Sequence, residues 1–201
     1  MLHRVPLSAR LGVIGVCFAA LSIGTAAAAS NPNVQVVGGS TGLAITPAVL
    51  PVLASHHITV SPIAPGRVRT GTLVGKKTVV FNFPITGGKV NPKTLVGYIR
   101  HSGGLAFSHN GKTVRVGLFT VIIAKHPRLT AAVNLNPAVR VPLLTLDVSK
   151  IRVVKTSHRI SVLGVRVALT KTAATALNQG LGTKVFAAGL KLGVANVYAK
   201  A

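Results

Sequence analysis

Acidic side chains are so scarce in this sequence that few catalytic sites can be built from it. Among the 201 residues there is one acidic residue, Asp147, and no glutamate. A pair of carboxylates for glycoside hydrolysis is therefore impossible, as is a divalent metal site bridged by carboxylates, and a Ser-His-Asp triad could use only Asp147. Alternation within the predicted strand 144–148 places Asp147 opposite the leucines, where we predict an exposed partner for Lys150 or Arg152. We therefore expect a protein that is not an enzyme.

Histidine is the other residue type here that could ligate a metal or act as a base. Seven are present, but His56 and His57 are adjacent, and adjacent side chains do not converge on one metal. These two and His109, His126 and His158 are predicted to be surface residues. We predict no metal site, although a site assembled from distant histidines stays open. With so few carboxylates to protonate, we expect stability to change mainly between about pH 7 and pH 5, where buried histidines titrate, and to be nearly flat below.

Charge is the second constraint on function. The sequence has 23 lysines and arginines and a formal net charge of +22, and such a field attracts polyanions. The basic residues are spaced along the chain, which favours a strongly basic folded surface over a disordered arm. We expect a binding protein whose partners are anionic cell-wall polymers or an anionic membrane surface. Specific nucleic-acid binding is disfavoured, because few aromatic residues are available to stack on bases.

The segment 1–29 has the three parts of a secretory signal peptide. Arg4 and Arg10 supply the positive charge, residues 11–23 are apolar, and an alanine tract supplies the small residues before a cleavage site. An uncleaved membrane anchor is the alternative, but glycine and serine dilute the apolar run. We predict a signal peptide at 1–29 and a mature chain, 30–201, that is secreted and either released or retained at the cell envelope. The single cysteine of the chain lies in this leader, so the mature chain has neither a disulfide nor a thiolate site.

Strand signals dominate the predicted mature chain. Valine, isoleucine and threonine recur in short runs bounded by glycine, proline and asparagine, which is the spacing of antiparallel sheets. We predict a mainly β fold, an antiparallel β-sandwich or β-barrel with one or two short helices, in a single domain. An apolar strand ending in threonine and followed by a short helix occurs twice, at Thr46 and Thr170. This similarity indicates two related halves or arises by chance.

Two local patterns predict particular turns and helices. Asn110-Gly111 fits a two-residue type I′ turn, which pairs Phe107 with Val114 and places both on one apolar face of a hairpin. Further along the chain, a threonine at the N-cap predicts a helix over 171–179, ended by one of the two glycines that follow it. A second helix is predicted to start at a proline near residue 47 and to be either short or kinked, because another proline follows four residues later.

Three short motifs in the second half of the chain resemble a known family. They are Ile-Arg-His-Ser-Gly-Gly-Leu at 99–105, Pro-Arg-Leu-Thr-Ala at 127–131, and a closing segment from 169 to 193. On these motifs, residues 87–199 resemble the HtaA-type domain of secreted and cell-wall-associated actinobacterial proteins. The resemblance implies a β-rich extracellular module and, as in the best-known members, haem as a possible ligand.

The resemblance also assigns the one candidate ligand-binding residue. His101 matches the family's histidine before the Gly-Gly-Leu segment. The family's iron-ligating tyrosine lies in an aromatic N-terminal motif, whereas this sequence has no tryptophan and no tyrosine before residue 87. If residues 99–109 form one strand, Tyr98 and His101 point to opposite faces and cannot bind one iron without a bulge. The alternative is that His101 packs at a sheet edge with its ring hydrogen-bonded.

Overall fold

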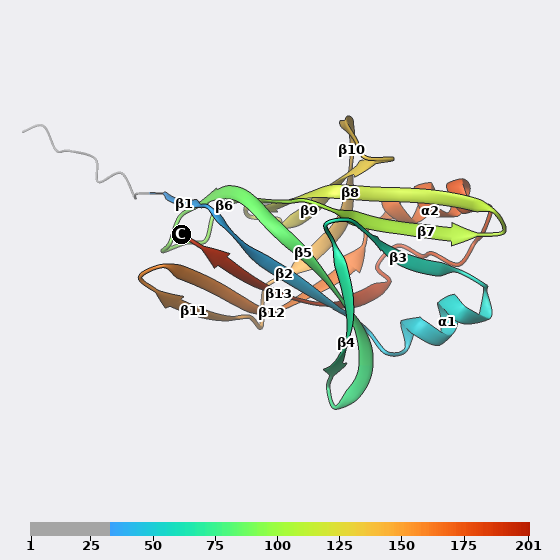
Figure 1. Ribbon diagram of the computed structural model, residues 1–201, viewed down its shortest axis with the longest axis horizontal. Helices are drawn as coiled ribbons and strands as arrows, with labels where there is room; N and C mark the ends of the chain where they lie inside the picture. Colours follow the sequence, from blue (N-terminus) through green and yellow to red (C-terminus); the bar gives the residue numbers. More distant parts are fainter. Residues whose placement is uncertain (1–32) are drawn as a thin grey trace, which may run out of the picture. The chain divides into compact units, whose positions relative to one another are not determined.

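The structure is a computed structural model that describes residues 33–201, so the predicted signal peptide lies outside the described residues. These residues form antiparallel strands and two short helices (Figure 1). In chain order the elements are β1 (Val34–Val36), β2 (Gly38–Ile45), α1 (Val49–Ser55), β3 (Thr59–Ile63), β4 (Arg67–Leu73), β5 (Lys76–Val90), β6 (Gly97–His101), β7 (Gly104–His109), β8 (Lys112–Ile123), β9 (Arg128–Val133), β10 (Asn136–Asp147), β11 (Arg152–Thr156), β12 (Arg159–Leu169), α2 (Lys171–Leu181) and β13 (Lys191–Lys200).

Eight of the strands pair in a closed antiparallel ring. The order is β5, β2, β13, β12, β10, β9, β8 and β6, and β6 pairs back to β5. Because every strand of this ring has two neighbours, the ring is a barrel with no free edge. The predicted mainly β fold with short helices is confirmed, and of its two forms the barrel describes this ring.

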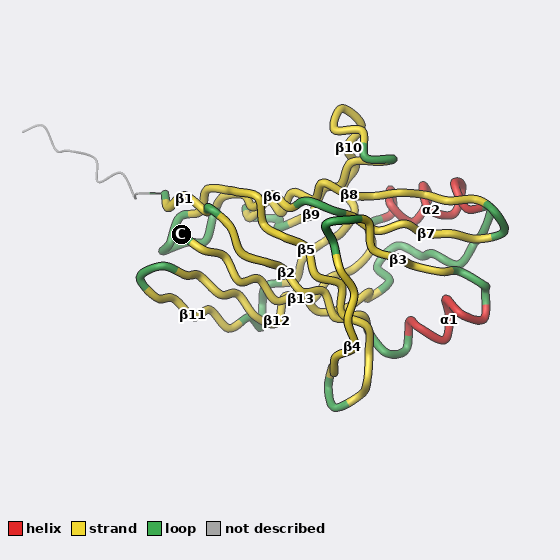
Figure 2. Tube along the Cα trace, in the orientation of Figure 1, coloured by secondary structure: helices red, strands yellow, loops and turns green. Residues whose placement is uncertain are grey.

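The remaining strands extend the barrel at its margins. β1 continues the line of β2 along β5, β11 pairs with β12, and β7 and β3 continue the sheet beyond β8. β4 pairs with the first half of β5, and Figure 2 shows this hairpin projecting from the body of the barrel. β1 and β11 therefore lie at the end of the ring that contains β6, whereas β3, β4 and β7 lie at the other end.

The predicted hairpin is confirmed in register and in turn geometry. β7 and β8 pair Phe107 with Val114 and Leu105 with Val116. Asn110 and Gly111 have φ angles of 46° and 76°, as a type I′ turn requires. Phe107 packs edge to face on Phe186, with ring centroids 5.9 Å apart. The apolar face of the hairpin therefore belongs to the core, as its alternation predicted.

Helix α2 confirms the predicted cap and extends two residues beyond the predicted end. The Thr170 hydroxyl accepts a hydrogen bond of 3.1 Å from the Ala173 amide. Gly182 ends the helix with a φ of 67°, which glycine adopts at low cost. α2 buries Ala173 and Leu177 against the barrel.

Removing the α2 cap should have a moderate, local cost. We expect Thr170→Ala to lower the free energy of unfolding by about 1 kcal/mol, because the Ala173 amide loses its side-chain acceptor. Thr170→Ser keeps the hydroxyl and should lose less than half as much. Urea denaturation of the two variants checks this, and equal losses would show that the hydroxyl does not act as a cap.

Helix α1 begins two residues later than predicted. It starts at Val49 after Ala48, so Pro47 precedes the helix and Pro51 lies in its first turn. In the first turn the backbone N–H groups have no intrahelical acceptor, so a proline there removes no helical hydrogen bond. The prediction of a short helix is confirmed by its 7 residues. Within residues 33–201, no helix is long and apolar enough to span a membrane.

Candidate functional site

The candidate residue His101 lies inside the barrel, at the end of the strand that closes it. β6 has β5 on one side and β8 on the other, and Ile99 and His101 are buried while Arg100 is exposed. The interpretation that placed His101 at a sheet edge is therefore wrong, because β6 is an internal strand of the ring. The other part of that interpretation, a hydrogen-bonded ring, is right, since His101 Nε2 and the Thr41 hydroxyl are hydrogen-bonded at 2.7 Å.

Residues 99–109 do not form one continuous strand. β6 ends at His101, Gly103 has a φ of 80°, and β7 begins at Gly104. The inward face is nevertheless shared, because His101, Leu105 and Phe107 are all buried. Tyr98 lies on the other face of β6 with Arg100, whose guanidinium donates to the Tyr98 hydroxyl at 3.1 Å. Tyr98 and His101 therefore point apart, as the alternation predicted.

Burial favours the neutral form of the His101 imidazole. Its side chain is 5% exposed. Desolvation lowers the pKa of His101 from 6.5 to about 4, and the nearby Phe119 backbone offsets part of that lowering. No protein group meets hydrogen-bond geometry with His101 Nδ1, which makes it the single buried side-chain polar atom without a partner in residues 33–201. Buried polar atoms without a partner are rare in folded proteins.

The lumen around His101 contains an apolar cavity of about 250 Å³. Its walls are valines, leucines and isoleucines from the strands of the ring, with the aromatic rings of Phe83 and Phe119 packed edge to face at 5.0 Å. Its polar lining residues are Thr41, Thr94 and His101. A second cavity, of about 460 Å³, lies between α1 and the strands. Four leucines line both cavities and form the partition between them: Leu43, Leu105, Leu143 and Leu144.

The first cavity reaches the surface between three loops. These loops connect β5 to β6, β8 to β9 and β10 to β11, and each contributes lining residues. Val96 in the first loop is 51% exposed, and Val148 in the third is 38% exposed. Because exposed residues line the cavity here, we call these loops, residues 91–96, 124–127 and 148–151, its mouth.

Asp147 forms an exposed ion pair, as predicted, but with a different partner. Its carboxylate contacts the Arg166 guanidinium at 3.5 Å across the β10–β12 pair, and not Lys150 or Arg152. The predicted partners lie in the β10–β11 connection and in β11, whereas pairing with β12 places Arg166 directly opposite. Hydrogen bonds from the Ser149 side chain and backbone lower the pKa of Asp147, and Arg166 adds to this. The carboxylate is exposed and has no histidine among its partners, so its contacts do not form a catalytic arrangement.

The other histidines do not gather into a site. His56, His57, His126 and His158 are exposed, as predicted. His109 was predicted to be a surface residue, but it is half-buried and its Nδ1 is hydrogen-bonded to the Leu181 carbonyl at 3.0 Å. Hairpin β7–β8 folds back on α2, which brings this ring against the helix end. Within residues 33–201 no three His, Cys, Asp or Glu side chains are grouped as metal ligands.

His101, as arranged here, does not fit haem. Its Nε2 is bonded to Thr41 and its ring is almost fully buried. The cavity of about 250 Å³ is smaller than the roughly 300–1,000 Å³ of most small-molecule sites, and a porphyrin is a rigid disc. Neither Tyr98, on the outer face, nor the exposed Tyr198 lies on the lumen side to provide a second ligand. Ligation by His101 would need both a broken hydrogen bond and a wider lumen.

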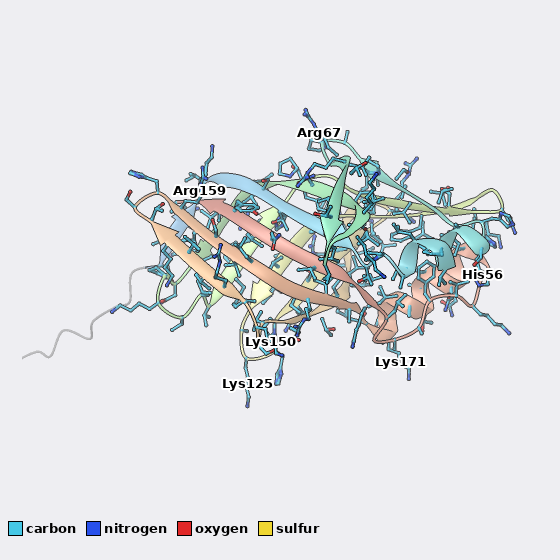
Figure 3. All side chains as sticks on the ribbon, turned by 90° about the horizontal axis from the view of Figure 1, so that it is seen from below. His56, Arg67, Lys125, Lys150, Arg159 and Lys171 are labelled. Atoms are coloured by element: carbon cyan, nitrogen blue, oxygen red, sulfur yellow. The ribbon has the colours of Figure 1, made fainter. Side chains whose placement is uncertain are left out.

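The outer surface carries the basic residues. Every lysine and arginine within residues 33–201 is exposed, whereas the described chain contains one ion pair, Arg166 with Asp147. Figure 3 shows the labelled Arg67, Lys125, Arg159 and Lys171 projecting outward at separate places. The positive charge is therefore spread over the exterior and has almost no internal counter-charge.

Comparison with solved structures supports the fold. No family model and no curated protein matches the sequence. Among solved structures, the C-terminal domain of HtaA from Corynebacterium glutamicum is similar with a TM-score of 0.58 and 15% identity, over 83% of this chain and 98% of that one. A domain-swapped dimeric variant of the same domain covers 76% of this chain with a TM-score of 0.49. At this identity the similarity concerns the fold alone, and residues 33–201 have the fold of an HtaA-type domain.

Proposed function

We propose that this chain is an exported, non-catalytic binding protein that attaches to anionic polymers of the cell envelope through its basic exterior. The observation that carries the proposal is the exposure of every lysine and arginine in residues 33–201, beside a single ion pair. Charges of one sign repel one another on a compact surface. Because the fold supplies one side-chain carboxylate, the compensating anions must come from outside.

Export is supported by the sequence of the segment 1–29, with its charged, apolar and small-residue parts. We expect the mature chain to begin at Ser30, and mass spectrometry of the protein from culture supernatant measures this directly. An intact Met1 in a membrane fraction would overturn this part of the proposal.

Attachment should be electrostatic and distributed over the surface. We expect retention on an anionic cell-wall polymer to fall steeply between low salt and about 0.5 M salt, because exposed charges are screened over about 10 Å already at 0.1 M. Two triple variants remove the same number of charges from two different regions. In one, glutamine replaces Arg67, Arg69 and Lys76 in β4 and β5, and in the other it replaces Lys171, Lys184 and Lys191, between α2 and β13. Both triple variants should elute at similarly reduced salt.

The paired variants control for one another, because they carry the same net charge. If one triple variant loses retention and its counterpart keeps it, binding uses a specific patch and the distributed mode is wrong. Retention that does not depend on salt would contradict the electrostatic proposal as a whole.

Haem is the second candidate ligand, on the ground of the resemblance and of the fold that this chain shares with the HtaA domain. The burial of His101 and its bond to Thr41 argue against it. Titration with haemin tests it, with His101→Gln as the control variant. We expect the Soret band of haemin to be the same with the wild type and with His101→Gln. A shift of the Soret band that occurs only with the wild type would establish the haem alternative.

A further inference from the structure

We propose that the cavity around His101 binds an anionic amphiphile, with a linear apolar chain in the lumen and the acidic head group at the mouth. This site is separate from the polymer-binding exterior of the proposed function. The inference rests on three features: the apolar walls, the length of the lumen, and the charges on the mouth loops.

The walls of the cavity suit a hydrocarbon. Apart from Thr41, Thr94 and His101, its lining side chains are apolar. Thr41 and His101 are bonded to each other, so the deep part of the lumen offers few groups to a polar ligand. Apolar cavities of about 150 Å³ stay dry and bind benzene, so about 250 Å³ accepts a longer apolar group.

The depth of the cavity favours a chain over a ring system. Gly97 begins β6 beside the mouth and His101 ends it. At about 3.3 Å per residue, the imidazole lies roughly 13 Å along the strand from the mouth. The partition of four leucines lies beyond it and separates this lumen from the second cavity. The site is therefore long, narrow and of fixed length.

The mouth carries positive charge from all three loops. Lys93, Lys125 and Lys150 lie in the first, second and third loop, and all are exposed. Figure 3 shows the labelled Lys125 and Lys150 projecting to the same side of the molecule. No acidic residue lies in these loops, and the neighbouring Asp147 is engaged by Arg166. A carboxylate or phosphate held here would keep its charge in water while its chain is buried.

The loop that carries Lys93 is held in place by its own hydrogen bonds. The Asn91 side chain accepts from the amides of Lys93 and Thr94, at 2.8 and 3.0 Å. The Lys155 ammonium donates to the Pro92 carbonyl and ties β11 to this loop. This loop of the mouth is therefore ordered before a ligand arrives, which reduces the ordering cost of binding.

Calorimetry with a series of short amphiphiles tests the proposal on the mature chain. The probes are hexanoate, octanoate, decanoate and dodecanoate, with decyl phosphate, decanol and decyltrimethylammonium for the head group. We expect affinity to rise about fourfold per methylene and then to stop rising when the lumen is full. At least one of the two anions, decanoate or decyl phosphate, should bind more tightly than decanol, and decyltrimethylammonium should bind least tightly. The anion that binds more tightly identifies the preferred head group as a carboxylate or a phosphate.

Two sets of variants separate the mouth from the general field of the protein. Lys93, Lys125 and Lys150, in the mouth loops, are replaced together by glutamine in one variant, and Lys112, Lys171 and Lys184, which lie outside these loops, in its control. At 0.1 M salt we expect the mouth variant to lose roughly tenfold in decanoate affinity, from three exposed charge contacts, and the control less than twofold. Ala195 lines the lumen, so Ala195→Leu reduces its volume and should weaken the binding of decanoate and of decanol equally.

Each contrary result overturns a stated part of the inference. Equal binding of decanol and decanoate excludes the charged mouth, and equal losses in the two lysine variants do the same. Affinity that keeps rising with chain length shows adsorption outside the lumen, whether or not the Ala195→Leu variant folds. If no probe binds the mature chain while polymer retention persists, the cavity site is wrong and the proposed function stands.

Discussion

Replacement of Gly97 by alanine is expected to destabilise the protein strongly, because two penalties fall on one residue. Gly97 has a φ of 148°, and a Cβ there would lie 2.0 Å from the backbone oxygen of Lys89. A non-glycine residue in such a region costs about 1–3 kcal/mol, and relieving an overpacked contact costs about 1–3 kcal/mol more. Since Gly97 begins β6, the strand that closes the ring, both costs fall on closure of the barrel.

Gly75→Ala is the matched control for this substitution. Gly75 also has a positive φ, 72°, but no atom lies within 4 Å of the position of its Cβ. Alanine there should cost only about 1–2 kcal/mol, the ordinary penalty of the left-handed conformation. Thermal unfolding by circular dichroism measures both variants. If the two variants have the same melting temperature, the close approach of β5 to β6 is not the reason that glycine is needed at position 97.

Acidification from pH 7 to pH 4 is expected to remove about 3 kcal/mol of stability, through His101. Burial lowers the pKa of His101 to about 4, against 6.5 for the exposed residue. The unfolded chain takes up the proton first, so the stability is complete above pH 6.5, is lost as the pH falls, and changes no further below about pH 4. Each pKa unit corresponds to about 1.4 kcal/mol, which gives the magnitude.

His101→Gln is the control for the acid effect, since glutamine can bond to Thr41 and does not titrate. Urea midpoints at fixed ionic strength should slope between pH 6.5 and 4 in the wild type and be nearly level in the variant. The lowered pKa of Asp147 stabilises the folded state above pH 3.8, its ordinary pKa, and this stabilisation is lost as the pH falls below that value. Because the carboxylate is exposed, its contribution is small. An equal slope in both proteins would assign the acid response to another group.

Most of the correct predictions from the sequence depend on interactions between residues that are close together in the chain. The Asn110-Gly111 turn, the Thr170 cap and the outward direction of Tyr98 depend on neighbouring residues, and each is confirmed. The pH window was predicted to end near pH 5; burial of His101 moves the expected lower limit to about pH 4. Alternation gave the side of the strand on which His101 lies but not how deeply it is buried.

Contacts between distant residues account for the rest. The bond between Thr41 and His101 joins residues 60 positions apart, and no pattern in either segment indicates the other. Asp147 pairs with Arg166, which is distant in the sequence, because β10 and β12 are neighbours in the ring. The interpretation of His101 as an edge residue failed for the same reason, since the pairing of β6 with both β5 and β8 is a property of the closed barrel.

The order of strands around the ring has a consequence for how the chain matures. β13, the last strand to be synthesised, lies between β2, the first of the ring, and β12. β2 therefore has no partner on that side until the whole ring sequence has been made, and contacts so far apart in sequence form slowly. The ring therefore cannot close before β13 has been made, and until then β2 and β12 each have an unpaired edge.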